Sequence, residues 1–154
     1  MIRLQTEDLD IGALLNQFCL GRTDIGGVVS FTGLARHEDG QVTGLELEAY
    51  PGFTEIWIEE LVLTAGQRFS LLDALIVHRT GLIAPSQAIV FVACAARHRR
   101  QAFEGADFLM DHLKSQAPFW KKQHGPGGTH WIEPRSIDYQ DLDRWKVSPG
   151  GANK

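Results

Sequence analysis

Apolar residues repeat with two different periods along this chain, and the period predicts where strands and helices lie. Weak alternation predicts a short strand over residues 2–5, and helical spacing predicts a helix that begins near residue 10 and ends near residue 18. Alternating or continuous apolar segments predict further strands over residues 25–33, 41–50, 74–79, 87–96 and 129–133. Helical spacing with acidic residues in the early turns predicts a helix over residues 54–69.

The strongest helix prediction begins at Arg99 or Arg100 and ends at Gln116, because Ala117-Pro118 follows. On a helical wheel its apolar stripe consists of Phe103, Ala106, Met110, Leu113 and Ala117. Phe108 projects on the far side of this helix. It indicates either a second apolar contact, such as a subunit interface, or a single exposed apolar residue.

This order of elements predicts one α+β domain. Strands follow strands twice without an intervening helix, which disfavours a doubly wound parallel sheet. The 154 residues are enough to bury one hydrophobic core. The domain is expected to span residues 1–146, and residues 147–154 are expected to form a disordered tail.

Composition excludes several classes of protein. The 44% hydrophobic and 22% charged residues are typical of globular proteins, and no apolar run is long enough to span a bilayer. The first residues have no signal-peptide pattern, and Cys19 and Cys94 are far apart, so a reducing cytoplasmic location is expected. The net charge of -4 disfavours nucleic-acid binding, and no motif with metal-ligand spacing is present.

Charge is distributed unevenly along the chain. Residues 1–60 hold 11 acidic and 3 basic residues, whereas residues 97–124 hold 6 basic and 3 acidic residues. The cations at Arg97-His98-Arg99-Arg100 begin a helix, where they oppose the helix dipole. They indicate an anion site or, equally, pairing with the acids of the first sixty residues. Arg36, in the polar loop after the second strand, is a further candidate anion contact.

Lys114 lies at the edge of the apolar helix stripe, and this position has two interpretations. Its stem lies along the core while the ammonium reaches water, or the amine is partly desolvated and acts near neutral pH as a base or nucleophile. Lys121 follows seven residues later, after the stiff segment Pro118-Phe119-Trp120. If this segment holds the two lysines together, they form an anion pocket and lower each other's pKa.

Several segments together resemble a known family, the large catalytic subunits of molybdopterin synthase. The resemblance spans roughly residues 1–135 and is strongest in the segment from Met110 to Lys121, which contains Lys-x-x-Ala-Pro-Phe-Trp-Lys. Further matching segments are Gly27–Gly33 with Arg36, Leu47–Glu55, Val77–Gly81, Val90–Arg99, Ala102–Glu104 and Trp131–Glu133. Ala49 stands where members of the family often have histidine before Tyr-Pro-Gly.

The resemblance implies an α/β hammerhead fold with an additional small β region, and a homodimer that binds two small subunits in a 2+2 heterotetramer. Each small subunit is ubiquitin-like, and its C-terminal Gly-Gly thiocarboxylate enters the active site. Two sulfurs are then transferred to cyclic pyranopterin monophosphate (precursor Z), giving the molybdopterin dithiolene. No metal or other cofactor, membrane or nucleic acid takes part.

The resemblance also implies roles for particular residues. Lys114 and Lys121 match the catalytic lysines. The matching substrate-binding positions are Leu34, Ala35, Arg36, His98, Arg99, Lys114, Lys121, Lys122 and Gln123. Two other functions are weighed against this one: a non-catalytic binder of phosphorylated ligands or nucleic acid, and a scaffold that only binds a ubiquitin-like partner.

Overall fold

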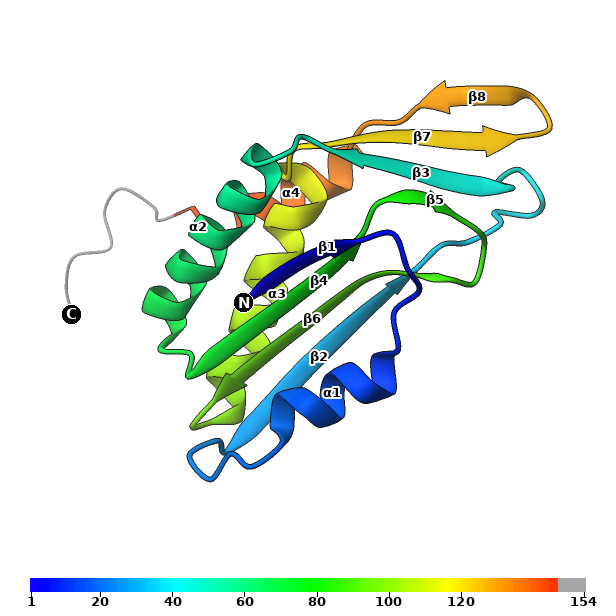
Figure 1. Cartoon of the computed structure of the whole chain (residues 1–154). Helices are drawn as coiled ribbons and strands as arrows, with labels where there is room; N and C mark the ends of the chain where they lie inside the picture. The colour runs from blue at the N-terminus through cyan, green and yellow to red at the C-terminus, as the bar shows by residue number, and fades with distance from the viewer. Residues whose placement is uncertain (147–154) are drawn as a thin grey trace.

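Two β-sheets of four strands each make up the framework of the computed structural model, which describes residues 1–146 (Figure 1). The large sheet has the order β1 (Ile2–Gln5), β4 (Asp73–Arg79), β6 (Ala88–Ala96), β2 (Gly27–Leu34). The small sheet has the order β5 (Gly81–Ile83), β3 (Gly44–Ala49), β7 (Phe119–Gly125), β8 (Gly128–Trp131). The predicted α+β class is confirmed. The tail prediction for residues 147–154 lies outside the described residues.

Helices cover both faces of the large sheet (Figure 1). Helix α1 (Ile11–Cys19) packs on one face through Leu14, against a cluster that includes Val77 and Phe91. Helices α2 (Phe53–Phe69) and α3 (Arg99–Ser115) pack on the other face, where their core cluster includes Ile76 and Val92. Successive strand residues point to opposite faces, so one strand serves both clusters. This explains why β4 and β6 are continuous apolar runs.

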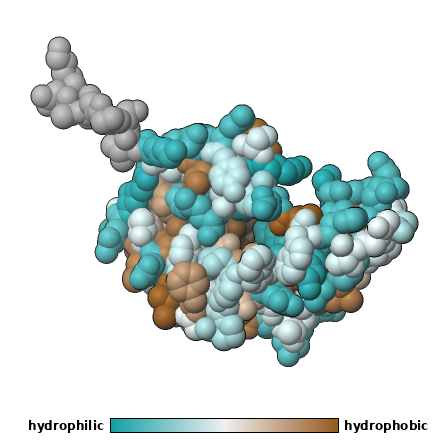
Figure 2. Space-filling model, turned by 90° about the horizontal axis from the view of Figure 1, so that it is seen from above, coloured by the Kyte–Doolittle hydropathy of each residue, from teal (hydrophilic) through white to brown (hydrophobic). Residues whose placement is uncertain are grey.

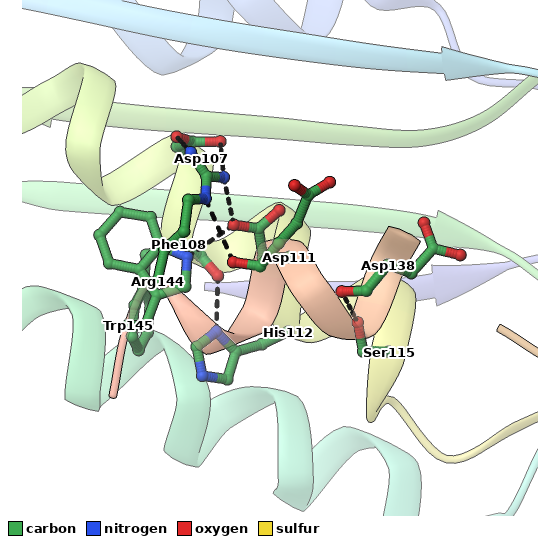
Figure 3. A network of polar contacts seen from close by, with 9 residues as sticks. Asp107, Phe108, Asp111, His112, Ser115, Asp138, Arg144 and Trp145 are labelled. Carbon is green, nitrogen blue, oxygen red and sulfur yellow. Dashed lines mark hydrogen bonds and ion pairs between the residues drawn. The ribbon is translucent and has the colours of Figure 1, made fainter. Parts of the chain in front are cut away.

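A helix that the sequence patterns did not predict, α4 (Ser136–Asp143), packs against α3 (Figure 3). The carboxylate of Asp111 accepts hydrogen bonds from Arg144 Nη2 and Trp145 Nε1, both at 2.6 Å. Ser115 Oγ donates to the backbone carbonyl of Asp138 at 2.9 Å. These contacts join the last turns of α3 to the C-terminal segment.

The expectations for two α3 phenylalanines are corrected by this packing. Phe108 is buried, because the rings of Phe69 and Trp145 enclose it at centroid distances of 5.3 and 5.4 Å. It therefore provides no surface for a subunit interface. Phe103, expected in the buried stripe, is 55% exposed. With α2 and α4 packed against α3, the buried arc of the helix is turned away from Phe103 and towards Phe108.

Two strands of the small sheet were also missed. The sequence patterns predicted no strand between residues 80 and 86, where β5 lies, and none directly after Pro118, where β7 lies. Gly125 ends β7 against the backbone of Gln41, where a Cβ atom would lie 2.1 Å from the carbonyl oxygen. The predicted strands and the two long helices otherwise begin and end within three residues of the observed elements. Within the described residues, no helix has the length and apolar character needed to cross a membrane.

Candidate active site

A cleft opens where the large sheet meets the small sheet, and it consists of two adjoining cavities. Both cavities are lined by Leu34, Arg36, Leu45, Ile89, Lys114, Lys121 and Ile132. The apolar compartment, of about 530 Å³, is further lined by Phe31, Leu47, His78, Val90, Met110 and Leu113. The polar compartment, of about 600 Å³, is further lined by Ala35, Glu38, Gln123, Glu133, Arg135 and Asp138. Seen from above, one side of the molecule projects as a lobe separated from the body by a notch (Figure 2).

Strand register determines which β7 side chains face this cleft. Phe119, Lys121 and Gln123 alternate with Trp120 and Lys122, so the two sets point to opposite faces of the small sheet. Lys121 pairs with Leu47 of β3, and both residues line the apolar compartment. Lys121 therefore enters the cleft from the inner face of the small sheet.

Thr54 anchors the start of β7. Its buried hydroxyl donates to the carbonyl of Pro118 at 2.8 Å and accepts from the backbone N–H of Tyr50 at 2.9 Å. A buried hydroxyl that is satisfied on both sides holds its partners firmly. The Ala-Pro-Phe-Trp-Lys segment thus leaves α3 in one fixed direction, and Lys121 follows from it.

Lys114 and Lys121 each line both compartments. Lys114 stands in the last turn of α3 with an exposed side chain, which agrees with a stem along the core and an ammonium in water. Lys121 is half-buried. Burial lowers the pKa of Lys121, and the nearby charge of Lys114 lowers it further, while Asp138 opposes both effects. The desolvated amine is thus Lys121 rather than Lys114.

Arg36 reaches the cleft from the loop after β2. The loop is held at Ala35, whose N–H donates to the Gln87 carbonyl at 2.9 Å and whose carbonyl accepts from Ser86 at 2.8 Å. The guanidinium of Arg36 remains exposed, with one long contact of 3.5 Å to Glu38. It is therefore available to an anion in either compartment. Gln123 lines the polar compartment from the inner face of β7.

Three of the residues expected to bind substrate lie outside this cleft. The ammonium of Lys122 lies 4.4 Å from the ring centroid of Trp131, on the outer face of the small sheet. His98 and Arg99 stand at the start of α3, and Arg99 lines a separate cavity of about 570 Å³. Fifteen residues of helix separate Arg99 from Lys114, a rise of about 22 Å. Within one chain these residues do not meet the two lysines.

The cleft also contains residues that the sequence reasoning missed. His78 is buried at the end of β4 and lines the apolar compartment. Arg135 and Asp138 line the polar compartment; the Asp138 carboxylate accepts from the Arg135 N–H at 2.8 Å. The available signals were a histidine at the end of an apolar strand and a polar segment after Trp131. Neither has a spacing that indicates a site.

Four cations and three carboxylates line the polar compartment, but they are not equally engaged. Glu38 is paired with Arg36, and Asp138 with Arg135. In the part of the chain that the structure describes, neither Lys114 nor Lys121 forms an ion pair. No cluster of three or more histidine, cysteine or acidic residues suited to a metal ion is found there. The arrangement is a cleft with two free ammonium groups between an apolar and a polar compartment, suited to an anionic reactant.

Comparisons with known proteins agree with this geometry. A family model described as MoaE protein matches residues 4–116. The molybdopterin synthase catalytic subunit of Caulobacter vibrioides is 55% identical over 145 residues, covering 94% of this chain and 97% of that protein. The MoaE protein of Burkholderia ambifaria superposes with a TM-score of 0.82 at 42% identity, covering 96% of this chain and 99% of that one.

A more distant structure shares the fold. It is a complex of subunits 1 and 2 of the molybdopterin-converting factor of Helicobacter pylori, with a TM-score of 0.74 at 22% identity, covering 88% of this chain and 92% of that one.

Fold and cleft together define an α+β enzyme subunit with a cationic cavity. The chain belongs to the MoaE family. It is a catalytic subunit of molybdopterin synthase, a sulfurtransferase of molybdenum cofactor biosynthesis. The family expected from the sequence is confirmed.

Proposed function

We propose that this cleft transfers sulfur from the C-terminal thiocarboxylate of a ubiquitin-like small subunit to precursor Z. Two such transfers produce the dithiolene of molybdopterin. The observation that carries this proposal is the pair of ammonium groups at the junction of the two compartments, Lys114 and Lys121, which form no ion pair within residues 1–146. Both reactants are anionic, and fixed cations stabilise an anion most effectively where water is limited.

The two compartments suit the two reactants in different ways. A Gly-Gly tail has no side chains, so it fits the apolar compartment, where Leu47 and Leu113 keep water from the thiocarboxylate. The pterin phosphate needs cationic donors, which Arg36 and Arg135 supply in the polar compartment.

The lysines have distinct parts in this mechanism. Lys114 binds the thiocarboxylate or transfers a proton as the sulfur attacks the pterin side chain. Lys121 stabilises the negative charge that develops during the transfer. Burial also lowers the pKa of Lys121, so its ammonium gives up a proton more readily than that of a fully solvated lysine.

The reconstituted reaction tests this function. Thiocarboxylated small subunit and precursor Z are mixed with the wild-type chain or with Lys114→Ala, and the dithiolene product is measured. We expect the variant to lose about 100-fold or more in rate while its affinity for the small subunit is retained. Full conversion by Lys114→Ala would mean that the chain acts as a scaffold for its partner and that the lysine is dispensable.

The active assembly, we propose, is a homodimer that binds two small subunits, and it works in the cytoplasm. His98 and Arg99 lie about 22 Å along α3 from Lys114, so they bind the same substrate only if a second protomer brings them to the cleft. The separation of these residues in one chain therefore supports a site shared between protomers.

Mixed dimers test this arrangement. Lys114→Ala and Arg99→Ala homodimers are both expected to be inactive, whereas co-expressed mixed dimers regain one intact site out of two. Their specific activity should approach half that of the wild type. No recovery in the isolated mixed dimer would assign Arg99 a role within its own protomer, and an active Arg99→Ala homodimer would show that it has none.

A further inference from the structure

His78 is a buried titratable residue in the cleft that the sulfur transfer described above does not use. It lies at the end of β4, where the large sheet meets the small sheet. Its ring stacks on Phe119 of β7 with a centroid distance of 4.3 Å and an interplanar angle of 24°. The imidazole therefore has one fixed orientation on the wall of the apolar compartment.

The tautomer of His78 follows from its neighbour. Nδ1 lies 2.8 Å from the backbone carbonyl oxygen of Arg79, and a carbonyl can only accept a hydrogen bond. Nδ1 therefore carries the proton, and Nε2 of the neutral ring is an acceptor. Burial lowers the pKa of His78 to about 4, so the ring stays neutral at physiological pH.

Nε2 has no hydrogen-bond partner among the described residues, although the side chain is only 6% exposed. The ring lines the apolar compartment, so this free acceptor is open to a donor that enters the cavity. Lys121 is a candidate donor, because it lines the same compartment as His78. It extends from the same face of β7 as Phe119, two residues further on, and its charge acts on the His78 ring.

The other groups near Lys121 are donors, are already hydrogen-bonded, or line only the polar compartment. Lys114 of α3 and Arg36 of the loop after β2 are donors only. The Asp138 carboxylate of α4 is bound by the Arg135 backbone, and Glu38 is paired with Arg36. Glu133 lines the polar compartment alone. On the apolar side of the cleft, His78 is the side chain with a free nitrogen lone pair.

We propose that His78 is a positioning residue for Lys121, because its Nε2 accepts a hydrogen bond from the Lys121 side chain when the lysine turns into the apolar compartment. This hydrogen bond holds the amine over the position where the sulfur arrives. This role of His78 therefore rests on the proposed function and adds a residue to it. The contact persists in both protonation states of the lysine, since ammonium and amine both donate.

Two amide substitutions separate this role from a purely structural one. The amide of His78→Asn coincides with Nδ1 and retains the bond to the Arg79 carbonyl, but it has no acceptor at the Nε2 position. The longer side chain of His78→Gln reaches the Nε2 position and loses the Nδ1 bond instead. A structural histidine tolerates the Asn variant better, whereas a positioning histidine tolerates the Gln variant better.

The first measurement needs no substrate. Lysine side chains carrying 13C at Cε are titrated by NMR, and the Lys121 resonance is assigned from its absence in Lys121→Arg. We expect His78→Asn to lower the pKa of Lys121 below its wild-type value, because an acceptor that stabilises the ammonium is lost. His78→Gln should restore it. An unchanged Lys121 titration in His78→Asn overturns the proposal, whatever the activity.

The second measurement is single-turnover sulfur transfer with the same variants. His78→Asn should transfer sulfur about tenfold more slowly at unchanged affinity for precursor Z, and His78→Gln should remain near the wild-type rate. Should neither variant fold, His78→Phe keeps the stack on Phe119 and takes the place of the Asn variant in both measurements. If wild type transfers no sulfur at all, the proposed function fails, while the NMR titration still decides the role of His78.

Discussion

The two sheets have the same number of strands, but they are built from different residues and do different work. The large sheet is enclosed by helices on both faces, and its central strand β6 is buried from Val90 to Ala96. In the small sheet, β7 carries Lys121 and Gln123 into the cleft and Lys122 onto the outer face, and β8 is exposed along its length. The large sheet supplies more of the buried core than the small sheet does, and the small sheet brings Lys121 into the cleft that Lys114 of α3 also lines.

The difference shows how a stable domain can hold a polar cleft. Buried ammonium groups are costly, and the small sheet could not meet that cost alone with its exposed β8. The apolar contacts of the large sheet and α3 supply the stabilisation that offsets this cost. The hydrogen bond from Thr54 to the Pro118 carbonyl fixes the position of β7 relative to them. We therefore expect the two sheets to respond differently to substitution.

The largest expected effect is on stability. Phe91→Ala, in the completely buried part of β6, should lower the free energy of unfolding by about 3–5 kcal/mol. The matched substitution Phe103→Ala, at a ring that is 55% exposed on α3, should cost less than about 1 kcal/mol. Urea unfolding of both variants checks this contrast. Equal losses would show that the exposed helix face contributes as much as the core of the large sheet.

A smaller effect, at the junction of the two sheets, depends on pH. The pKa of His78 is about 4 in the folded chain and close to 6.5 when unfolded, so the unfolded chain binds more protons between these values. Stability is therefore lost as the pH falls. From pH 7 to pH 5 the loss attributable to His78 is about 2 kcal/mol.

Urea unfolding at both pH values measures this loss. His112, whose pKa is also lowered by burial, contributes in the same direction, so the comparison with His78→Gln isolates the His78 part. The variant, which has no titrating group at this position, should lose correspondingly less stability on acidification. An equal loss in both proteins would mean that His78 is protonated as easily in the folded chain as in the unfolded one.

The same contrast explains what sequence patterns predicted. The strands of the large sheet and the helices α2 and α3 repeat their apolar residues with a clear period, because one or both faces are buried. Strand β7 alternates cleft-facing and outer polar residues, Lys121 against Lys122, so hydrophobicity alone has no period there. Helix α4 buries little beyond Leu142 and was missed for the same reason. Phe108 could be taken for an exposed residue because the segment that covers it, around Trp145, follows this missed helix.

The cleft was predicted only in part. Lys114, Lys121 and Arg36 were identified from charge and from a family motif, and they line one cleft. His78 belongs to an apolar strand, and nothing in its spacing reveals that the small sheet stacks Phe119 on it. The sequence predicted the length of α3 and therefore the distance between Arg99 and Lys114. That a site is shared between protomers could be inferred only from the position of the cleft.

The most direct test of the central claim compares two neighbouring lysines of β7. Dithiolene formation from thiocarboxylated small subunit and precursor Z is measured for Lys121→Ala and for Lys122→Ala. The first removes the half-buried amine in the cleft, and the second removes an ammonium that lies over Trp131 on the outer face. We predict a loss of about 100-fold or more for Lys121→Ala and a rate within about twofold of wild type for Lys122→Ala. Equal losses, or full activity of Lys121→Ala, would contradict the assignment of the chemistry to the inner face of the small sheet.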